Sequence, residues 1–173
     1  TGARKYPLIL GHEFSGVVAE TGANVTEVKT NDRVVVVPLI PCGACECCKK
    51  GLFGICDDYN IIGTGSNGAF AEYVAVPQNN VLKIPDELDF MSSAGVEPAT
   101  IGYHALQKAN IQPGETVAII GCGAIGLLTL QWAKIFGASR VIAVDISDEK
   151  LDLARKLGAD ITVNSSRIDP IEK

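Results

Sequence analysis

The sequence lacks features that would place it in several large classes of protein. Acidic residues outnumber basic ones by 20 to 15, so the formal net charge is −5 and no excess of positive charge exists to attract nucleic acid. No apolar run reaches the roughly 20 residues that a membrane-spanning helix needs. The chain shows no internal repeat, and nothing at residues 1–10 resembles a signal peptide. We therefore expect a cytoplasmic protein with no nucleic-acid or membrane partner.

The chain has enough apolar residues for a packed core, since 47% of its 173 residues are hydrophobic and only 20% are charged. The pattern changes near residue 90. Residues 1–90 predict a β-rich domain with strands within 17–25, 31–38, 69–77 and 81–84, and Val34–Val37 should be buried on both faces. Residues 91–173 predict alternating helices and strands, with a buried strand at 116–120 and further strands at 140–145 and from 161. A helix broken near Glu97–Pro98 should precede them, with a new helix beginning close to Pro98.

Most of the cysteines fall within one short stretch, residues 41–56. Cys42, Cys45, Cys48 and Cys56 have the spacing C-x-x-C-x-x-C-x7-C, which lets four thiolates surround one tetrahedral zinc ion. A pair of disulfides is the alternative, but it requires an oxidising compartment, and the adjacent Cys47 and Cys48 would be awkward to bridge. We therefore predict a structural zinc lobe over residues 41–58, with Cys47 spare. Because four thiolates leave no open position, this zinc should do no chemistry.

His12 and Glu13 form a second candidate metal site. A lone histidine before a strand is more often an ordinary core or turn residue, and adjacent side chains reach one ion only where the chain bends, as Gly11 and Gly16 would allow. Glu97 should stand just before a helix start, where it either caps the helix or faces a cleft. We interpret His104, inside that helix, as a packed or solvated residue and not as a ligand.

A glycine-rich turn, GCGAIG at residues 121–126, follows the strand at 116–120 and opens the next helix. Gly121 would allow the tight turn, Gly123 the approach of a pyrophosphate, and Gly126 close packing of helix and strand. An acid, Asp145, ends the following strand, where it could accept hydrogen bonds from ribose hydroxyls and would repel a 2′-phosphate. This context predicts a dinucleotide site that prefers NAD to NADP. A glycine turn in an empty α/β domain is the alternative.

These motifs together resemble the zinc-dependent medium-chain alcohol dehydrogenases. The residues from Gly11 to Val25 are similar to that family's G-H-E-x-x-G-x5-G-x-x-V signature, the four cysteines to its structural zinc lobe, and GCGAIG to its cofactor turn. VEPATIGYHAL resembles the polyol dehydrogenase branch, in which Glu97 stands where other alcohol dehydrogenases have a cysteine ligand. Asn31 departs from the family's usual glycine, but asparagine tolerates the left-handed conformation.

The resemblance implies a fold and a set of site residues. The fold is α/β overall: a β-rich GroES-like catalytic domain with a zinc lobe at 1–90, then the first half of a Rossmann doubly wound parallel sheet at 91–173. A catalytic zinc would be held by His12, Glu13 and Glu97, with Glu13 either a ligand or a support for one, and Glu97 reaching the zinc directly or through water. The residues expected to bind NAD are Gly121, Gly123, Ala124, Ile125, Gly126, Asp145 and Lys150.

The implied reaction is oxidation of a secondary alcohol on a polyol or polyol phosphate to a ketone, with zinc polarising the alcohol oxygen and NAD accepting hydride. Oxidation of an amino alcohol, as by threonine dehydrogenases, and a non-catalytic relative are the alternatives. The family's first catalytic ligand, a cysteine, lies upstream of the G-H-E motif, and its nucleotide sheet has six strands. We therefore expect an internal part of a longer homo-oligomeric enzyme, a dimer or tetramer, inactive alone, with an open sheet edge that pairs with another chain.

Overall fold

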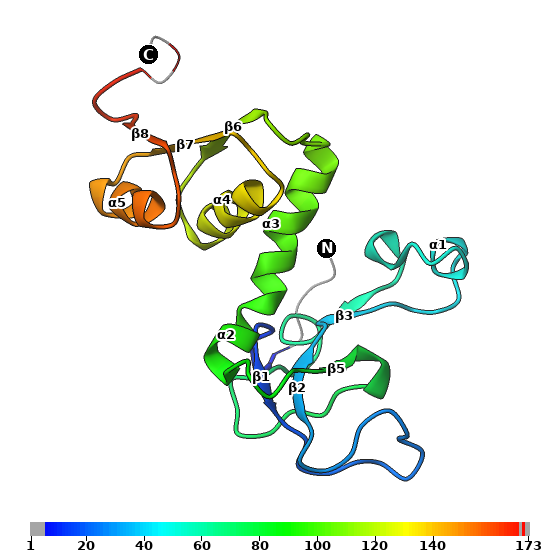
Figure 1. The fold of residues 1–173 in the computed structure, drawn as a ribbon. Coiled ribbons are helices and arrows are strands. Elements are labelled where there is room, and N and C mark those ends of the chain that lie inside the picture. Colours follow the sequence, from blue (N-terminus) through cyan, green and yellow to red (C-terminus); the bar gives the residue numbers. More distant parts are fainter. Residues whose placement is uncertain (1–5, 170, 172–173) are drawn as a thin grey trace. The chain divides into compact units, whose positions relative to one another are not determined.

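The computed structural model describes residues 6–169 and residue 171, and it divides the chain into two compact units, Thr1–Glu97 and Pro98–Lys173. Figure 1 shows the order of the elements along the chain. None of the helices in the described residues is both long and apolar enough to cross a membrane.

Two small antiparallel sheets organise the first unit. The larger has the strand order β1-β2-β5, with Val17 opposite Arg33 and Val36 opposite Val81, and the smaller pairs β3 with β4. Asn80 connects the two sheets, because its side-chain amide donates to the carbonyls of Val37 (2.6 Å) and Leu39 (2.8 Å). The strands are β1 (Ser15–Val17), β2 (Arg33–Val36), β3 (Leu39–Ile40), β4 (Asn60–Ile61) and β5 (Val81–Lys83), and the helical segments are α1 (Glu46–Lys49), η1 (Phe53–Ile55), η2 (Gln78–Asn80) and α2 (Phe90–Ala94).

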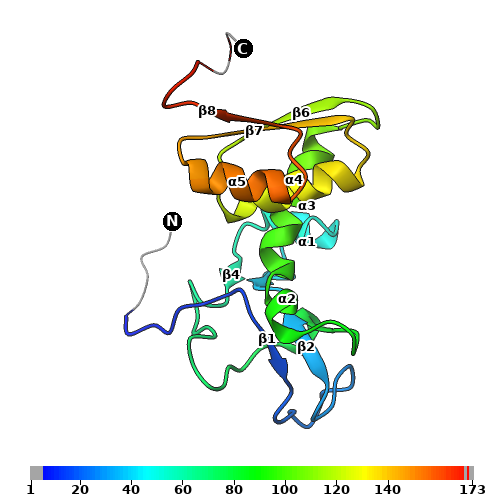
Figure 2. The same ribbon diagram turned by 60° about the vertical axis from the view of Figure 1, so that its left-hand side comes forward.

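The second unit is built around a parallel sheet with the order β6-β7-β8, whose strands alternate with helices. Both helices between the strands lie against the same face of this sheet, as Figures 1 and 2 show. The core contains Val117 and Val141 from the strands and Leu130 and Leu151 from the helices. Helix α3 (Val96–Ala109) begins with the last two residues of the first unit and continues into the second. The other elements are β6 (Thr116–Ile120), α4 (Ala124–Ile135), β7 (Arg140–Asp145), α5 (Asp148–Lys156) and β8 (Ile161–Asn164). This is the expected first half of a doubly wound sheet, with one face covered.

Three sequence expectations for the first unit are wrong. The run at 17–25 contributes only Val17 to a strand, as the last residue of β1, and residues 18–25 lie in no strand. Residues 69–77 are not a strand. Within the described residues, only Ala69 and Phe70 of this run donate backbone hydrogen bonds to another segment, and residues 71–76 form no backbone hydrogen bond with any other described segment. A strand needs such a ladder, so alternation alone was insufficient, and Tyr73 remains 77% exposed. Val37 is also exposed, because the pairing of β2 with β5 ends at Val36.

Two details of the second half also differ from expectation. The strand at 116–120 is buried on one face only, and Ile120 is 86% exposed because no described helix covers its side of the sheet. The helix break falls at Gly95, so α3 begins at Val96 and Glu97 lies inside its first turn instead of just before it. Pro98 is tolerated there because the N–H groups of a first turn have no partner within the helix. Asn31 has a φ of 73°, which confirms the left-handed conformation expected of it.

Candidate metal and cofactor sites

The cysteine lobe brings four sulfur atoms together. The paired strands β3 and β4 close its base, and the sulfurs of Cys42, Cys45, Cys48 and Cys56 all lie within 4.8 Å of one another. The Cys42–Cys48 and Cys45–Cys56 sulfur pairs are each 3.9 Å apart. Four sulfurs around a zinc ion at about 2.3 Å would be separated by about 3.8 Å, whereas a disulfide requires about 2.05 Å. The lobe therefore has the geometry of a tetrahedral thiolate site and not of two disulfides.

Backbone N–H groups point at these sulfurs and favour their ionised form. Cys42 Sγ accepts from the N–H groups of Ala44 and Cys45 at 3.4 Å, Cys45 Sγ accepts from Cys48 N at 3.4 Å, and Cys56 Sγ accepts from Cys42 N at 3.3 Å. Such donors hold thiolates in place around a metal and partly neutralise their charge. They are available because Cys45 caps the short helix α1, so the chain turns around the sulfur cluster.

The thiols differ in how readily they ionise. The backbone N–H groups of Asp57 and Cys48 lower the pKa of Cys45 to about 6, whereas burial raises the pKa of Cys48 to about 12. A metal entering the lobe would therefore displace a proton from Cys48. Cys47 does not belong to the group of four, and burial raises the pKa of its thiol. The structure thus assembles the predicted ligand set and leaves Cys47 outside it, while zinc binding itself stays a prediction.

The second candidate set is His12, Glu13 and Glu97, whose ligand atoms also lie within 4.8 Å of one another. Gly11 supplies the bend that lets adjacent side chains converge, since its φ is +102°. Phe70 packs against this bend so closely that a Cβ on Gly11 would lie 2.7 Å from the phenyl ring. All three side chains belong to the first unit, and a cavity of about 350 Å³ opens beside His12 and Glu13.

Burial raises the pKa of the Glu97 carboxyl, the neighbouring His12 opposes that shift, and the charge of Glu13 adds to it. A divalent cation among these three groups would favour their ionised carboxylates, and zinc accepts both imidazole nitrogen and carboxylate oxygen. The donor set therefore fits a metal with an open coordination position. His104 is exposed and lies outside this set.

The glycine turn between β6 and α4 has the geometry of a phosphate cradle. Gly121 has a φ of +95°, and a Cβ on Gly126 would lie 1.8 Å from the Gly121 carbonyl oxygen. A Cβ on Gly123 would meet no described atom within 4 Å, so the space next to the backbone is open. No side chain of the described residues caps α4, which begins with Ala124 and Ile125. The N–H groups of its first turn therefore face a position where an anion would be stabilised.

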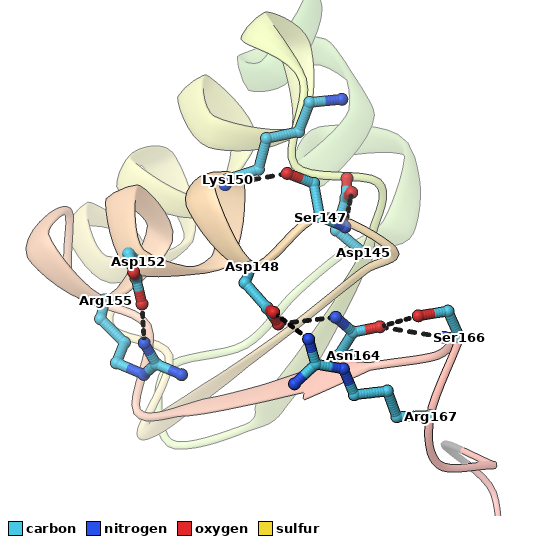
Figure 3. Close-up of polar contacts among 9 residues, drawn as sticks. All are labelled: Asp145, Ser147, Asp148, Lys150, Asp152, Arg155, Asn164, Ser166 and Arg167. Carbon is cyan, nitrogen blue, oxygen red and sulfur yellow. Dashed lines mark hydrogen bonds and ion pairs between the residues drawn. The ribbon is translucent and has the colours of Figure 1, made fainter.

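Asp145 stands at the carboxyl end of β7, and backbone donors hold both of its carboxylate oxygens. Oδ2 accepts from Cys122 N at 2.7 Å and Oδ1 from Ser147 N at 2.9 Å. These N–H groups hold the pKa of Asp145 below its usual range, and the charge of Lys150 lowers it further. The carboxylate is thereby fixed beside the glycine turn, as Figure 3 shows for its position next to Ser147.

A neighbouring polar network joins α5 to the end of β8 (Figure 3). Asn164 Nδ2 donates to Asp148 Oδ1 at 2.6 Å, and Arg167 forms an ion pair with the same carboxylate. Asn164 pairs in register with Asp145, so it ends its strand at the same edge of the sheet. Our reading of the sequence missed Asn164, although a polar residue at the carboxyl end of a parallel strand is a recognisable signal.

Two family descriptions match this chain. Residues 1–86 match the alcohol dehydrogenase GroES-like domain, and residues 124–173 match the zinc-binding dehydrogenase family. The galactitol 1-phosphate 5-dehydrogenase of Escherichia coli K12 is 44% identical over 167 residues, covering 96% of this chain and 48% of that protein. This chain belongs to the zinc-dependent alcohol dehydrogenase family. It spans about half the length of the curated relatives it matches.

Other family members fall in the same range of similarity. The L-threonine 3-dehydrogenase of Bacillus velezensis is 45% identical over 168 residues, covering 97% of this chain and 48% of that protein. The crystal structure of galactitol-1-phosphate dehydrogenase from E. coli has a TM-score of 0.92 at 43% identity, covering 99% of this chain and 49% of that one. A putative zinc-binding dehydrogenase from Sinorhizobium meliloti 1021, bound to NADP, has a TM-score of 0.94 at 40% identity, covering 98% and 49%. These structures confirm the fold of the family.

Proposed function

We propose that this chain supplies the catalytic metal site and the NAD site of a zinc-dependent enzyme that oxidises a secondary alcohol on a polyol or polyol phosphate. The observation that carries the proposal is the convergence of His12, Glu13 and Glu97 beside a cavity, in a chain that also holds a separate, closed cysteine set. A closed site serves structure, whereas a site with an open position serves chemistry.

The histidine and the two carboxylates would have different roles at the metal. His12 would bind the metal through an imidazole nitrogen, and the carboxylates of Glu13 and Glu97 would balance the charge of the ion. When bound, zinc would polarise the alcohol oxygen and NAD would accept the hydride. Two carboxylates in place of thiolates suit a harder, more water-accepting metal centre. The cavity beside His12 offers space for a small polar substrate.

Three features of the second unit support binding of the dinucleotide: the left-handed Gly121, the open space next to Gly123, and the uncapped start of α4. We infer that NAD is preferred, because the ionised Asp145 would repel a 2′-phosphate. Because a relative from S. meliloti is bound to NADP, the dissociation constants of both NAD and NADP have to be measured for this protein.

The substrate class rests on the relatives' names. Galactitol 1-phosphate 5-dehydrogenase supports a polyol phosphate, while the equally similar L-threonine 3-dehydrogenase supports an amino alcohol as the second candidate. A substrate screen on the full-length protein, following NADH formation, separates them. We expect turnover with polyols or their phosphates and none with L-threonine. Turnover with L-threonine alone would replace the first candidate with the second.

The variant Glu97→Gln is the control that links activity in the substrate screen to the metal site. Glu97→Gln keeps the size of the side chain but removes the charge that a metal needs, so activity should fall while the zinc of the cysteine lobe is retained. Full activity in this variant would show that Glu97 is not needed at the metal.

A further inference from the structure

Arg33 and Ser15 tie together the two chain segments that form the second metal set. His12 and Glu13 lie just before β1, whereas Glu97 lies in the first turn of α3, far away in the sequence. A metal site of this kind needs its ligands held in place by partners that do not touch the metal.

One connection runs from β1 to α2. The hydroxyl of Ser15 donates to the carbonyl of Phe90 at 2.5 Å. Ser15 opens the strand that follows His12, and Phe90 opens the short helix that leads through Gly95 into α3. Helix α2 also packs against β1. The start of α3 is therefore attached, through α2, to the strand that follows His12 and Glu13.

Arg33 makes a second and larger connection from β2, next to β1. Its Nη1 donates to the carbonyls of Pro85 (3.1 Å) and Asp86 (2.7 Å), and its Nη2 donates to the carbonyl of Leu88 (2.6 Å). The guanidinium also lies over the ring of Phe90, 4.6 Å from the ring centroid. One side chain thus fixes the whole connection from β5 to α2.

The hydrogen bonds of Arg33 to these backbone carbonyls order the segment at residues 85–90. The Arg33 side chain is only 24% exposed, so its bonds to the carbonyls are partly shielded from water. Its ion pair with Asp86 spans 3.8 Å, and because that carboxylate is 97% exposed, the pair contributes little. The planar fork of donors is what reaches several carbonyls and an aromatic face at once, and a lysine ammonium does not reproduce it.

We propose that Arg33, with Ser15, is a positioning residue for the metal site formed by His12, Glu13 and Glu97. It acts by holding residues 85–90, and hence the first turn of α3, against β1 and β2. This inference rests on the proposed function, since it assumes that the second set binds a divalent metal. Loss of such supporting contacts weakens metal binding by roughly tenfold to a hundredfold.

The test is titration of the full-length protein with Co2+, after mild chelation has removed labile metal and left zinc in the cysteine lobe. The absorption bands of cobalt then report the second site alone. We expect Arg33→Ala to lower the Co2+ affinity by roughly tenfold to a hundredfold, with the zinc of the cysteine lobe retained as evidence of folding. Arg33→Lys should also lower it, because one ammonium nitrogen cannot reach all of the carbonyls.

Lys83→Ala is the matched control. Lys83 lies on β5, also next to β2, and pairs with Asp32 at 2.8 Å, but within the described residues its side chain forms no hydrogen bond or ion pair with residues 85–90. This variant should bind Co2+ as the wild type does. If Arg33→Ala fails to fold, Arg33→Lys decides: wild-type affinity in that variant overturns the positioning role. A wild type that binds no second metal overturns both this inference and the proposed function.

Discussion

Replacing Cys48 by serine should cost the cysteine lobe its zinc. Cys48 is 7% exposed, and its sulfur lies 3.9 Å from that of Cys42, within the group of four. Serine is a shorter side chain and keeps its proton at neutral pH, so it does not replace a thiolate ligand. Structural zinc contributes roughly 10–16 kcal/mol of apparent binding free energy, and an equal share for one of four ligands is about 2.5–4 kcal/mol.

That share corresponds to a roughly hundredfold to thousandfold loss of zinc affinity. Because Cys48 is buried, water has poor access to the vacated position, which places the loss toward the upper end. The assay is zinc release to a coloured chelator, read beside thermal unfolding of the lobe. Cys47→Ser is the control: it changes the adjacent thiol, which lies outside the group of four, and should keep the zinc. Zinc lost from Cys47→Ser and kept by Cys48→Ser would refute the assignment.

Three further predictions concern the cofactor turn and the cysteine lobe. Asp145→Asn should weaken NAD binding and reduce discrimination against NADP in measurements of both dissociation constants; unchanged discrimination would argue against the role of its charge. Gly126→Ala should lower the free energy of unfolding by about 1–3 kcal/mol, because its Cβ would meet the Gly121 carbonyl. Gly123→Ala should leave the free energy of unfolding unchanged and weaken NAD binding, because its Cβ would meet no described atom. Equal stability of the two variants would contradict the packing argument. The zinc affinity of the lobe should rise with pH, because zinc must displace a proton from Cys48. It should fall more steeply below about pH 6, where Cys45 also becomes protonated. A zinc affinity that does not change with pH would be inconsistent with these pKa values.

The second unit could be predicted closely because its signals are local. Ser147 caps α5, Gly137 follows the end of α4 with a φ of +87°, and the strands at 140–145 and from 161 formed where the sequence placed them. Each of these features depends on residues close together in the chain. The alternation of helices and strands then leads to a parallel sheet with little further choice.

The first unit was harder to predict because its structure depends on contacts between distant segments. Residues 69–77 have the alternation of a strand, yet whether a strand forms depends on a neighbouring backbone that the local sequence does not specify. The convergence of His12 with Glu97 is likewise a long-range property. Local pattern left both residues ambiguous, and only the resemblance to a family suggested that they meet. The oligomeric state and the pairing of the open sheet edge stay predictions.

The most direct test of the central claim is the zinc content of the purified full-length protein. The account predicts two zinc ions per chain, one in the cysteine lobe and one at His12, Glu13 and Glu97. His12→Ala should remove one of them and Cys48→Ser the other. A single zinc that persists in His12→Ala and is lost in Cys48→Ser would contradict the claim that this chain carries a catalytic metal site.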